Sequence, residues 1–461
     1  KGDFRGSLSF NIDGYMRVMI RIKRKIDSSP FLKSVVVLFS GNVFANLISL
    51  LSIPILSRIY SDIAFGDYAI VISTATIVNG ISTLGLTSAI MIPVEENKAK
   101  SVFTTAWISH ILVSTFCFVL ALILLPVYSI YSITGSYSCS LLLMYLYVLL
   151  VGTFSLLSVY ANRLRKNRIL FWNAMINSLA LLCLAIPFGL WGWGGTGFLM
   201  ASTGGYLVAN IQMLYHMNPF KKIAYRDCVS VYKDFKDFII YQFPSNLIST
   251  FTIQLPNQLF SAYFGNASLG GYAMCERILG VPMRLIGAPI TTIYFRHSSE
   301  CIRECKDISG FTYILITRIL ILAFLPVLIL FSCSEVLFTF ILGDSWLLVG
   351  KIVSILIFPY VLLFCSNCVS YCLVVIGKQK INLYLSLLYL MLIVASVVSG
   401  FYVFSDFVSV VICFAVALIV FNLLNLLVIF YYLRKDFGRF VRFIGIYLLL
   451  IYLGLILIKY L

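Results

Sequence analysis

The chain has 461 residues, of which 61% are hydrophobic and 11% charged, and its formal net charge is +16. A composition this apolar excludes an ordinary soluble domain and is typical of an integral membrane protein. The sequence offers no soluble basic domain for nucleic acid, so the excess of Lys and Arg indicates membrane orientation and contact with anionic lipid.

Thirteen apolar stretches follow one another along the chain, each long enough to cross ~30 Å of hydrocarbon as a helix. Lipid supplies no partner for backbone N–H and C=O groups, so these stretches are predicted to be helices. They cover approximately 34–58, 68–92, 102–125, 139–161, 170–190, 197–215, 239–263, 271–294, 311–332, 352–376, 381–403, 408–432 and 441–458.

The basic residues fall mainly into every second gap between the stretches. Most of the 34 Lys and Arg residues lie in the arm 1–33 and in the segments 163–168, 221–236, 296–306 and 434–442. Because cytoplasmic loops retain Lys and Arg, this pattern predicts a multi-pass protein with a cytoplasmic N-terminus.

The gaps between the stretches are too short for a soluble catalytic domain of usual size. No G-x-x-x-x-G-K-[ST] phosphate loop occurs either, so the sequence indicates neither an enzyme nor an ATPase. No cofactor is predicted, although coupling to H⁺ or Na⁺ is possible. No metal site is predicted, because His297, Cys301 and Cys305 share a helical spacing without a fourth ligand.

An internal repeat relates the two halves of the chain. The segments Ser57–Ala69 and Ser261–Ala273 match at one constant offset, with identical Ser, Gly, Tyr and Ala residues and with Asp62 aligned to Asn266. A short upstream echo joins the Asn-Leu-Ile-Ser sequences that begin at Asn46 and Asn246. The repeat predicts two parallel six-helix bundles around a central cavity, with alternating access between them.

The predicted organisation has five parts. They are a basic cytoplasmic arm (1–33), an N-terminal six-helix bundle (34–216), a cytoplasmic linker (217–238), a C-terminal six-helix bundle (239–432), and a basic loop with a probable extra transmembrane helix (433–461). The fold class is therefore an all-α polytopic membrane protein.

Several short motifs carry a family resemblance. They include the residues from Phe65 to Ala69, from Gly271 to Pro282, and from Gly343 to Trp346. In this order and spacing they resemble the polysaccharide-transport family of the MOP superfamily, especially its O-antigen flippase (Wzx-like) branch, with a MATE-like fold.

The resemblance implies a function and a location. Its members move undecaprenyl-diphosphate-linked oligosaccharide, the O-antigen repeat unit, from the cytoplasmic to the periplasmic leaflet of the bacterial inner membrane. A polysaccharide polymerase and a chain-length regulator are the partners that it suggests.

Arginines within the predicted spans point independently to an anionic cargo. Arg277 and Arg284 are seven residues apart and so share one helix face, and Arg318 lies at a depth similar to Arg284. A guanidinium group binds phosphate oxygens in pairs and stays charged, which suits a diphosphate. The alternatives are pairing with Glu276 or helix-end carbonyls and, for Arg58 at a span end, simple snorkelling.

Glu276 is the only acidic residue expected well inside a span. Such a carboxylate can relay a proton or hold Na⁺, or it can neutralise a neighbouring arginine. Trp191, Trp193 and Trp346 are expected in an interfacial aromatic belt.

Three functions compete at this stage: the lipid-linked oligosaccharide flippase, a cation-coupled drug or small-molecule exporter of the same superfamily, and an O-antigen polymerase or ligase. The exporter predicts a cavity led by acidic and aromatic residues, and the polymerase predicts a large periplasmic loop. Neither pattern is found, so the flippase is favoured, whether its cargo is the O-antigen unit or another lipid-linked glycan precursor.

Overall fold

The computed structural model describes residues 30–124, 137–220, 225–236, 239–240, 243–304 and 306–460. Within these ranges the chain is helical and contains no strand, as predicted. The α-helices are α2 (Pro30–Ile59), α3 (Asp62–Ser82), α4 (Leu86–Ala89), α5 (Glu96–Leu124), α6 (Tyr137–Arg163), α7 (Asn167–Leu190), α8 (Gly194–His216), α9 (Tyr225–Asp234), α10 (Phe243–Leu279), α11 (Ala288–Arg303), α12 (Ser309–Leu342), α13 (Leu347–Cys368), α14 (Cys372–Val375), α15 (Gln379–Phe404), α16 (Phe407–Leu433) and α17 (Phe437–Tyr460). A π-helix, η2 (Met283–Gly287), and a 3₁₀ turn, η3 (Asp344–Trp346), complete them.

Most of the predicted stretches lie on these helices, and the seventh and eighth belong to one continuous run. Of the described residues, nine runs are long and apolar enough to cross a membrane, and one of them, Asn246–Arg303, is 58 residues long. That run covers most of the seventh predicted stretch and all of the eighth. Most of the predicted basic arm lies outside the described residues.

α10 is a helical hairpin. Gly265 interrupts it with φ 76° and ψ 177°, a conformation that a residue without a Cβ adopts easily. Beyond the interruption the chain folds back on itself. Two contacts between the legs show this: Asn257 contacts Glu276, and the ring centroid of Phe260 lies 4.8 Å from that of Tyr272. The sequence predicts a loop over 265–270, whereas in the structure Gly265 is the one residue of α10 with non-helical dihedral angles.

Polar caps fix the start of other helices. The Ser61 hydroxyl accepts a hydrogen bond from the backbone N–H of Ala64 at 3.3 Å, which starts α3. Asp406 accepts from the backbone N–H of Ser409 at 3.0 Å and starts α16 in the same way.

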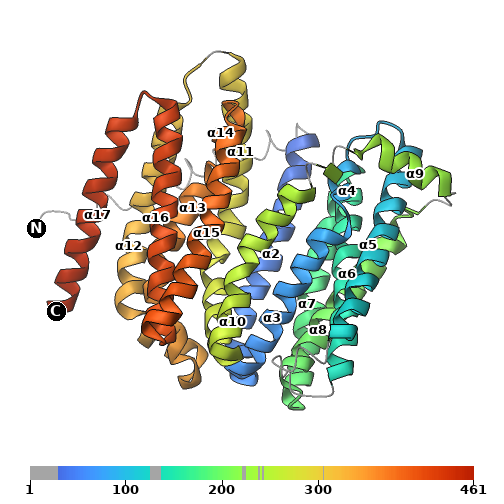
Figure 1. Cartoon of the computed structure of the whole chain (residues 1–461), viewed down its shortest axis with the longest axis horizontal. Coiled ribbons are helices and arrows are strands. Elements are labelled where there is room, and N and C mark those ends of the chain that lie inside the picture. The colour runs from blue at the N-terminus through green and yellow to red at the C-terminus, as the bar shows by residue number, and fades with distance from the viewer. Residues whose placement is uncertain are drawn as a thin grey trace, which may run out of the picture.

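The helices form two halves side by side. Figure 1 shows α4–α8 in cyan to green on one side and α11–α17 in yellow to red on the other, with α2, α3 and α10 between them. We call the end that holds segments 163–168, 296–306 and 434–442 the basic end. The opposite end, with the turns at 60–61, 191–193, 265 and 343–346, is the short-loop end.

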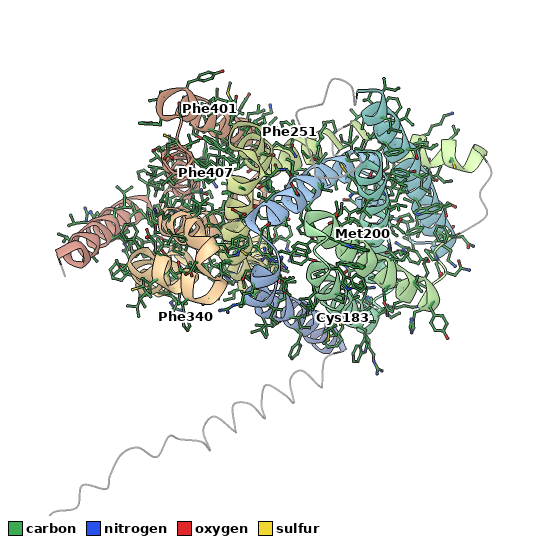
Figure 2. All side chains as sticks on the ribbon, turned by 90° about the horizontal axis from the view of Figure 1, so that it is seen from below. Cys183, Met200, Phe251, Phe340, Phe401 and Phe407 are labelled. Carbon is green, nitrogen blue, oxygen red and sulfur yellow. The ribbon has the colours of Figure 1, made fainter. Side chains whose placement is uncertain are left out.

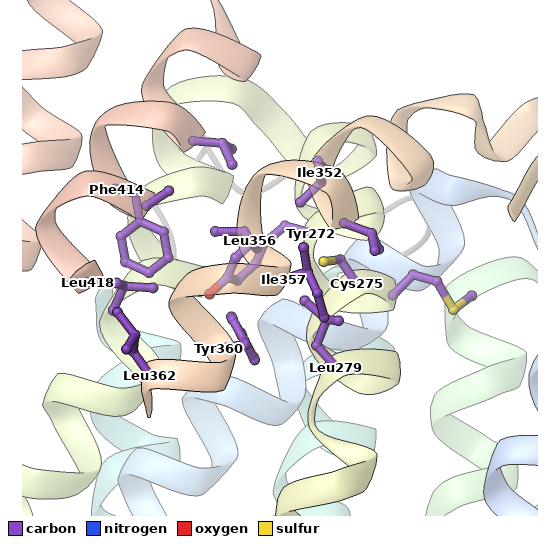
Figure 3. Packing of buried hydrophobic residues seen from close by; sticks show 14 of the residues in the cluster. Tyr272, Cys275, Leu279, Ile352, Leu356, Ile357, Tyr360, Leu362, Phe414 and Leu418 are labelled. Carbon is purple, nitrogen blue, oxygen red and sulfur yellow. The ribbon is translucent and has the colours of Figure 1, made fainter. Parts of the chain in front are cut away.

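Buried apolar side chains join the helices inside each half. Figure 3 shows Tyr272 and Leu279 of α10 packed with Leu356 and Tyr360 of α13 and with Phe414 of α16. The periphery is apolar as well, since large side chains such as Phe340 (81% exposed) point outward (Figure 2). An apolar exterior around an apolar interior is what a membrane-embedded bundle requires.

The thirteenth stretch forms α17, which packs on α12 and α16. At the basic end, Asp436 accepts hydrogen bonds from the Ser309 hydroxyl at 2.9 Å and from Arg439 Nη1 at 3.1 Å. Asp307 accepts from the backbone N–H of Ser309 at 2.9 Å, and Lys435 Nζ lies 3.3 Å from its carboxylate. The backbone N–H of Ser309 is the main reason that the pKa of Asp307 is below its usual value, and Lys435 lowers it further.

Candidate functional site

The two halves meet along an antiparallel contact in which α3 packs against the α10 hairpin and α2 packs against η2. Gln258 Nε2 donates to the hydroxyls of Ser73 (2.5 Å) and Thr74 (3.0 Å). A Cβ added at Gly80 would reach ordinary contact distance from Thr250. These contacts place the face of α3 directly on the face of α10.

The repeated motifs contact each other at the short-loop end. A Cβ at Gly66 would overlap the carbonyl group of Asn266, and a Cβ at Gly270 would overlap that of Asp62. Since Gly270 is the repeat counterpart of Gly66, and Asn266 of Asp62, each copy touches the other through equivalent positions. Such reciprocity is the mark of a two-fold relation between the halves.

Arg277 and Arg284 of the C-terminal half reach across this contact to α2. Arg277 Nη2 donates to the Ser49 hydroxyl at 3.1 Å, and Arg284 Nε donates to Asn46 Oδ1 at 3.3 Å. Arg284 Nη2 also donates to the backbone carbonyl oxygen of Arg277 at 2.8 Å, and we call these two residues the arginine patch. Gly280 permits this arrangement, because a Cβ there would press on Arg284 Nη1.

Glu276 lies within electrostatic range of Arg284, but it forms no direct ion pair with Arg284 or Arg277 in the described part of the chain. Glu276 Oε2 instead accepts from Asn257 Nδ2 at 3.4 Å, and Tyr272, Tyr360 and Tyr389 lie within its electrostatic range. The acid therefore belongs to a polar group inside the C-terminal half.

The other two predicted arginines lie elsewhere. Arg58, at the short-loop end of α2, donates to the carbonyl oxygen of Phe340 at 3.5 Å. Arg318 is exposed on α12, in line with the exposed Ile314 and Leu322. In the described part of the chain, neither Arg58 nor Arg318 contacts the patch of Arg277 and Arg284.

One tryptophan departs from the expected aromatic belt. Trp191 is 64% exposed, as a belt residue should be, but Trp346 is 1% exposed. Its ring lies edge-on to Phe65 at 5.1 Å, and its Nε1–H donates to the carbonyl oxygen of Ser57 at 2.8 Å. Trp346 is buried because η3 places its indole against the end of α2. There the indole contacts residues of the other half.

Sequence reasoning missed two buried polar residues. Asp67 is 5% exposed and accepts from Asn266 Nδ2 at 2.7 Å, across the boundary between the halves. His110, in the middle of α5, is fully buried and bonds the Ser82 hydroxyl at 2.7 Å and the Leu149 carbonyl oxygen at 3.2 Å. A mid-span histidine is itself a signal, since ionisable groups are rare at that depth.

The described residues hold no cluster of three or more His, Cys, Asp or Glu side chains arranged for a metal ion, and Cys305 lies outside them. The chemistry of the two guanidinium groups suits an anion. Two guanidinium groups now held by neutral oxygens would make stronger, charge-assisted hydrogen bonds to phosphate.

Solved structures with this architecture are membrane transporters. A lipid II flippase, MurJ, in an inward closed conformation aligns with TM-score 0.68 at 14% identity and covers 91% of this chain and 96% of its own. An inward-facing multidrug resistance MATE transporter of the MOP superfamily gives TM-score 0.59, 14% identity and coverages of 88% and 95%. A MOP superfamily transporter from Pyrococcus furiosus, described as having a binding pocket of reverse polarity, aligns with TM-score 0.55 at 14% identity. The alignment covers 88% of this chain and 96% of that transporter.

The fold is therefore that of the MOP superfamily of transporters, which are not enzymes. The sequence model of the family described as "Polysaccharide biosynthesis protein" matches residues 31–295, more than half of the chain, and the chain belongs to that family. Among curated proteins no sequence matches significantly.

Proposed function

We propose that the chain is a flippase that moves an undecaprenyl-diphosphate-linked oligosaccharide, the O-antigen repeat unit, from the cytoplasmic to the periplasmic leaflet by alternating access. The observation that carries the proposal is the patch formed by Arg277 and Arg284 between the two halves. The family description and the fold shared with a lipid II flippase support the same class of cargo.

The contacts suggest how cargo binding is linked to movement. Both arginines belong to the C-terminal half, whereas Ser49 and Asn46 belong to the N-terminal half. A diphosphate that takes over the guanidinium groups removes these ties between the halves. Binding then favours their separation at this depth, because a ligand shifts an equilibrium through its different affinity for the two states.

The test is replacement of each arginine in a strain that lacks the native protein. Arg277→Ala and Arg284→Ala should each weaken binding of undecaprenyl diphosphate about 10- to 150-fold, since a hydrogen bond to a charged group contributes ~1.5–3 kcal/mol. Lys at either position should restore part of the lost affinity. In cells with the Ala variants, lipid-linked oligosaccharide should accumulate on the cytoplasmic side. Arg303→Ala, at an exposed residue of the basic end, is the matched control. Full transport by both Ala variants would refute the proposal.

The remaining site residues and partners are part of the same proposal. Arg58 and Arg318 are proposed to contact cargo outside the central patch, Arg318 from an apolar face that suits a lipid tail. We also propose that the protein lies in the bacterial inner membrane with a cytoplasmic N-terminus. Anionic lipids, a polysaccharide polymerase and a chain-length regulator are its proposed partners.

Glu276 is the proposed coupling residue, for H⁺ or Na⁺. Among the described residues its carboxylate accepts one long hydrogen bond, from Asn257 at 3.4 Å, and forms no direct ion pair, so a cation can compete for the carboxylate. Flipping in proteoliposomes should respond to an imposed proton or sodium gradient in the native chain and not in Glu276→Gln. Equal rates in all conditions would make Glu276 structural and the protein a downhill facilitator.

Cation-coupled export of a small molecule is the second candidate, and the acidic and aromatic group around Glu276 is the observation that favours it. The two functions differ in what Arg277→Ala does. An exporter should keep its drug efflux in that variant, whereas the flippase should lose lipid transport.

A further inference from the structure

A cavity of about 420 Å³ lies in the C-terminal half, between the η2–α11 segment and the end of α13 near the basic end. This volume falls within the usual range of small-molecule sites. Its walls carry three kinds of group, namely hydroxyls, an amide and aromatic rings; the residues are Thr291, Thr292, Asn367, Ser370, Phe364 and Tyr371.

The polar groups of the cavity are neutral and have hydrogen-bonding capacity to spare. The Thr291 hydroxyl can donate to the carbonyl oxygen of Gly287 (2.9 Å) or of Asn367 (3.2 Å), which leaves its lone pairs open. Thr292 donates to the carbonyl oxygen of Ala288 at 2.9 Å and is open in the same way. Asn367 Nδ2 faces the Met283 thioether sulfur at 3.8 Å, a weak acceptor that a better one would replace.

The cavity adjoins the arginine patch. Met283 and Gly287, which line it, are the first and last residues of η2, and Arg284 lies between them in the same π-helical turn. Single π-helical turns inside α-helices occur frequently at functional sites. A diphosphate bound at Arg284 would therefore lie next to this neutral pocket.

Neutral hydroxyls, an amide and two aromatic side chains match the chemistry of an uncharged sugar. A sugar ring offers hydroxyl donors and acceptors on its edge and an apolar face that packs on an aromatic ring. No charged side chain lines the cavity, so it offers nothing for a second phosphate. We propose that this cavity is the subsite for the neutral sugar nearest the diphosphate of the cargo, an inference that rests on the proposed flippase function.

The test compares two probes on the purified full-length chain. One probe is undecaprenyl diphosphate without sugar, and the other is the undecaprenyl-diphosphate-linked repeat unit extracted from the strain that lacks the protein. The native chain should bind the glycan-linked lipid at least ~5-fold more tightly, the effect of about one added hydrogen bond. Asn367→Leu and Tyr371→Leu should each abolish this difference while leaving the affinity for the bare lipid unchanged.

Matched controls lie on α15. Asn382→Leu and Tyr384→Leu make the same chemical changes at exposed positions that do not line the cavity, and they should behave as the native chain does. A native chain that binds both lipids equally would overturn the subsite but not the flippase. A cavity variant that binds both lipids more weakly, and by the same factor, would also overturn the subsite, because the residues would then act on the diphosphate. Failure of the native chain to bind either lipid would overturn the proposed function itself.

Discussion

Gly66 lies against the backbone carbonyl of Asn266 so closely that no Cβ fits between them. The equivalent contact of Gly270 with Asp62 makes the closure of the short-loop end a reciprocal one. Helices in lipid gain little from the hydrophobic effect when they associate, so close approach at small residues supplies much of their attraction. The two glycines therefore control how stably this end is closed.

Gly66→Ala should favour states in which the halves are separated at the short-loop end. Overpacking by one methyl group typically costs ~1–3 kcal/mol, which corresponds to about 5- to 150-fold in population. A Ser73→Cys probe, at a position that is 1% exposed, should react with an externally added thiol reagent at least ~5-fold faster in the Gly66→Ala chain.

Gly310→Ala is the control for this experiment, since a Cβ at Gly310 meets nothing within 4 Å. It should leave the reaction rate of the Ser73→Cys probe unchanged. Equal rates in the Gly66→Ala and Gly310→Ala chains would show that the glycine contact does not hold the end closed.

Trp346→Phe should destabilise the protein by about 1–2 kcal/mol. The change keeps an aromatic ring beside Phe65 but removes the Nε1–H that bonds the carbonyl oxygen of Ser57 at 2.8 Å. Thermal unfolding in detergent measures the effect. Trp193→Phe, at an exposed indole, should change the midpoint little, and an equal loss in both variants would contradict the assignment.

The attachment of α17 should depend on pH through Asp307. Its pKa is lower in the folded chain than in the unfolded chain, so its contribution to stability is present above pH ~4 and is lost as the pH falls through the folded value. The native chain should therefore have a higher Tm than Asp307→Asn at neutral pH, and the difference should shrink below pH ~4. A difference that stays constant from pH 7 to 3 would exclude this carboxylate as its source.

The proposed orientation can be tested by cysteine labelling from outside the cell. Trp191→Cys, at an exposed position of the short-loop end, should react with an impermeant reagent, and Glu304→Cys at the basic end should not. The native chain, which already has 12 Cys residues, provides the background. The opposite pattern would reverse the topology and the proposed direction of transport.

The helices and the repeat were predictable because both are local patterns in the sequence. Apolar stretches of sufficient length must be helical in lipid, and the aligned residues around Gly66 and Gly270 indicated a duplication before any contact was known. The single break at Gly265 was not predictable, because a run that contains Gly, Asn and Ser is typical of a loop. Only the packing of the two helices of the hairpin shows that one residue suffices.

The arginine patch was predictable only in part. The seven-residue spacing placed Arg277 and Arg284 on one helix face, but their partners Ser49 and Asn46 lie 228 and 238 positions away in the chain. Which residues meet across the boundary depends on how the halves dock, and no local pattern encodes this. The same holds for Asp67, whose partner Asn266 comes from the other half.

The contact between Asp67 and Asn266 also bears on what gene fusion makes possible. In a dimer of two identical halves, whatever residue stood at the position of Asp62 would also stand at that of Asn266. An aspartate there would face Asp67 as a second carboxylate, whereas Asn266 donates a hydrogen bond to it at 2.7 Å. A single fused chain can keep the acid in one copy and the amide in the other, so its halves can acquire different chemistry while retaining the paired geometry.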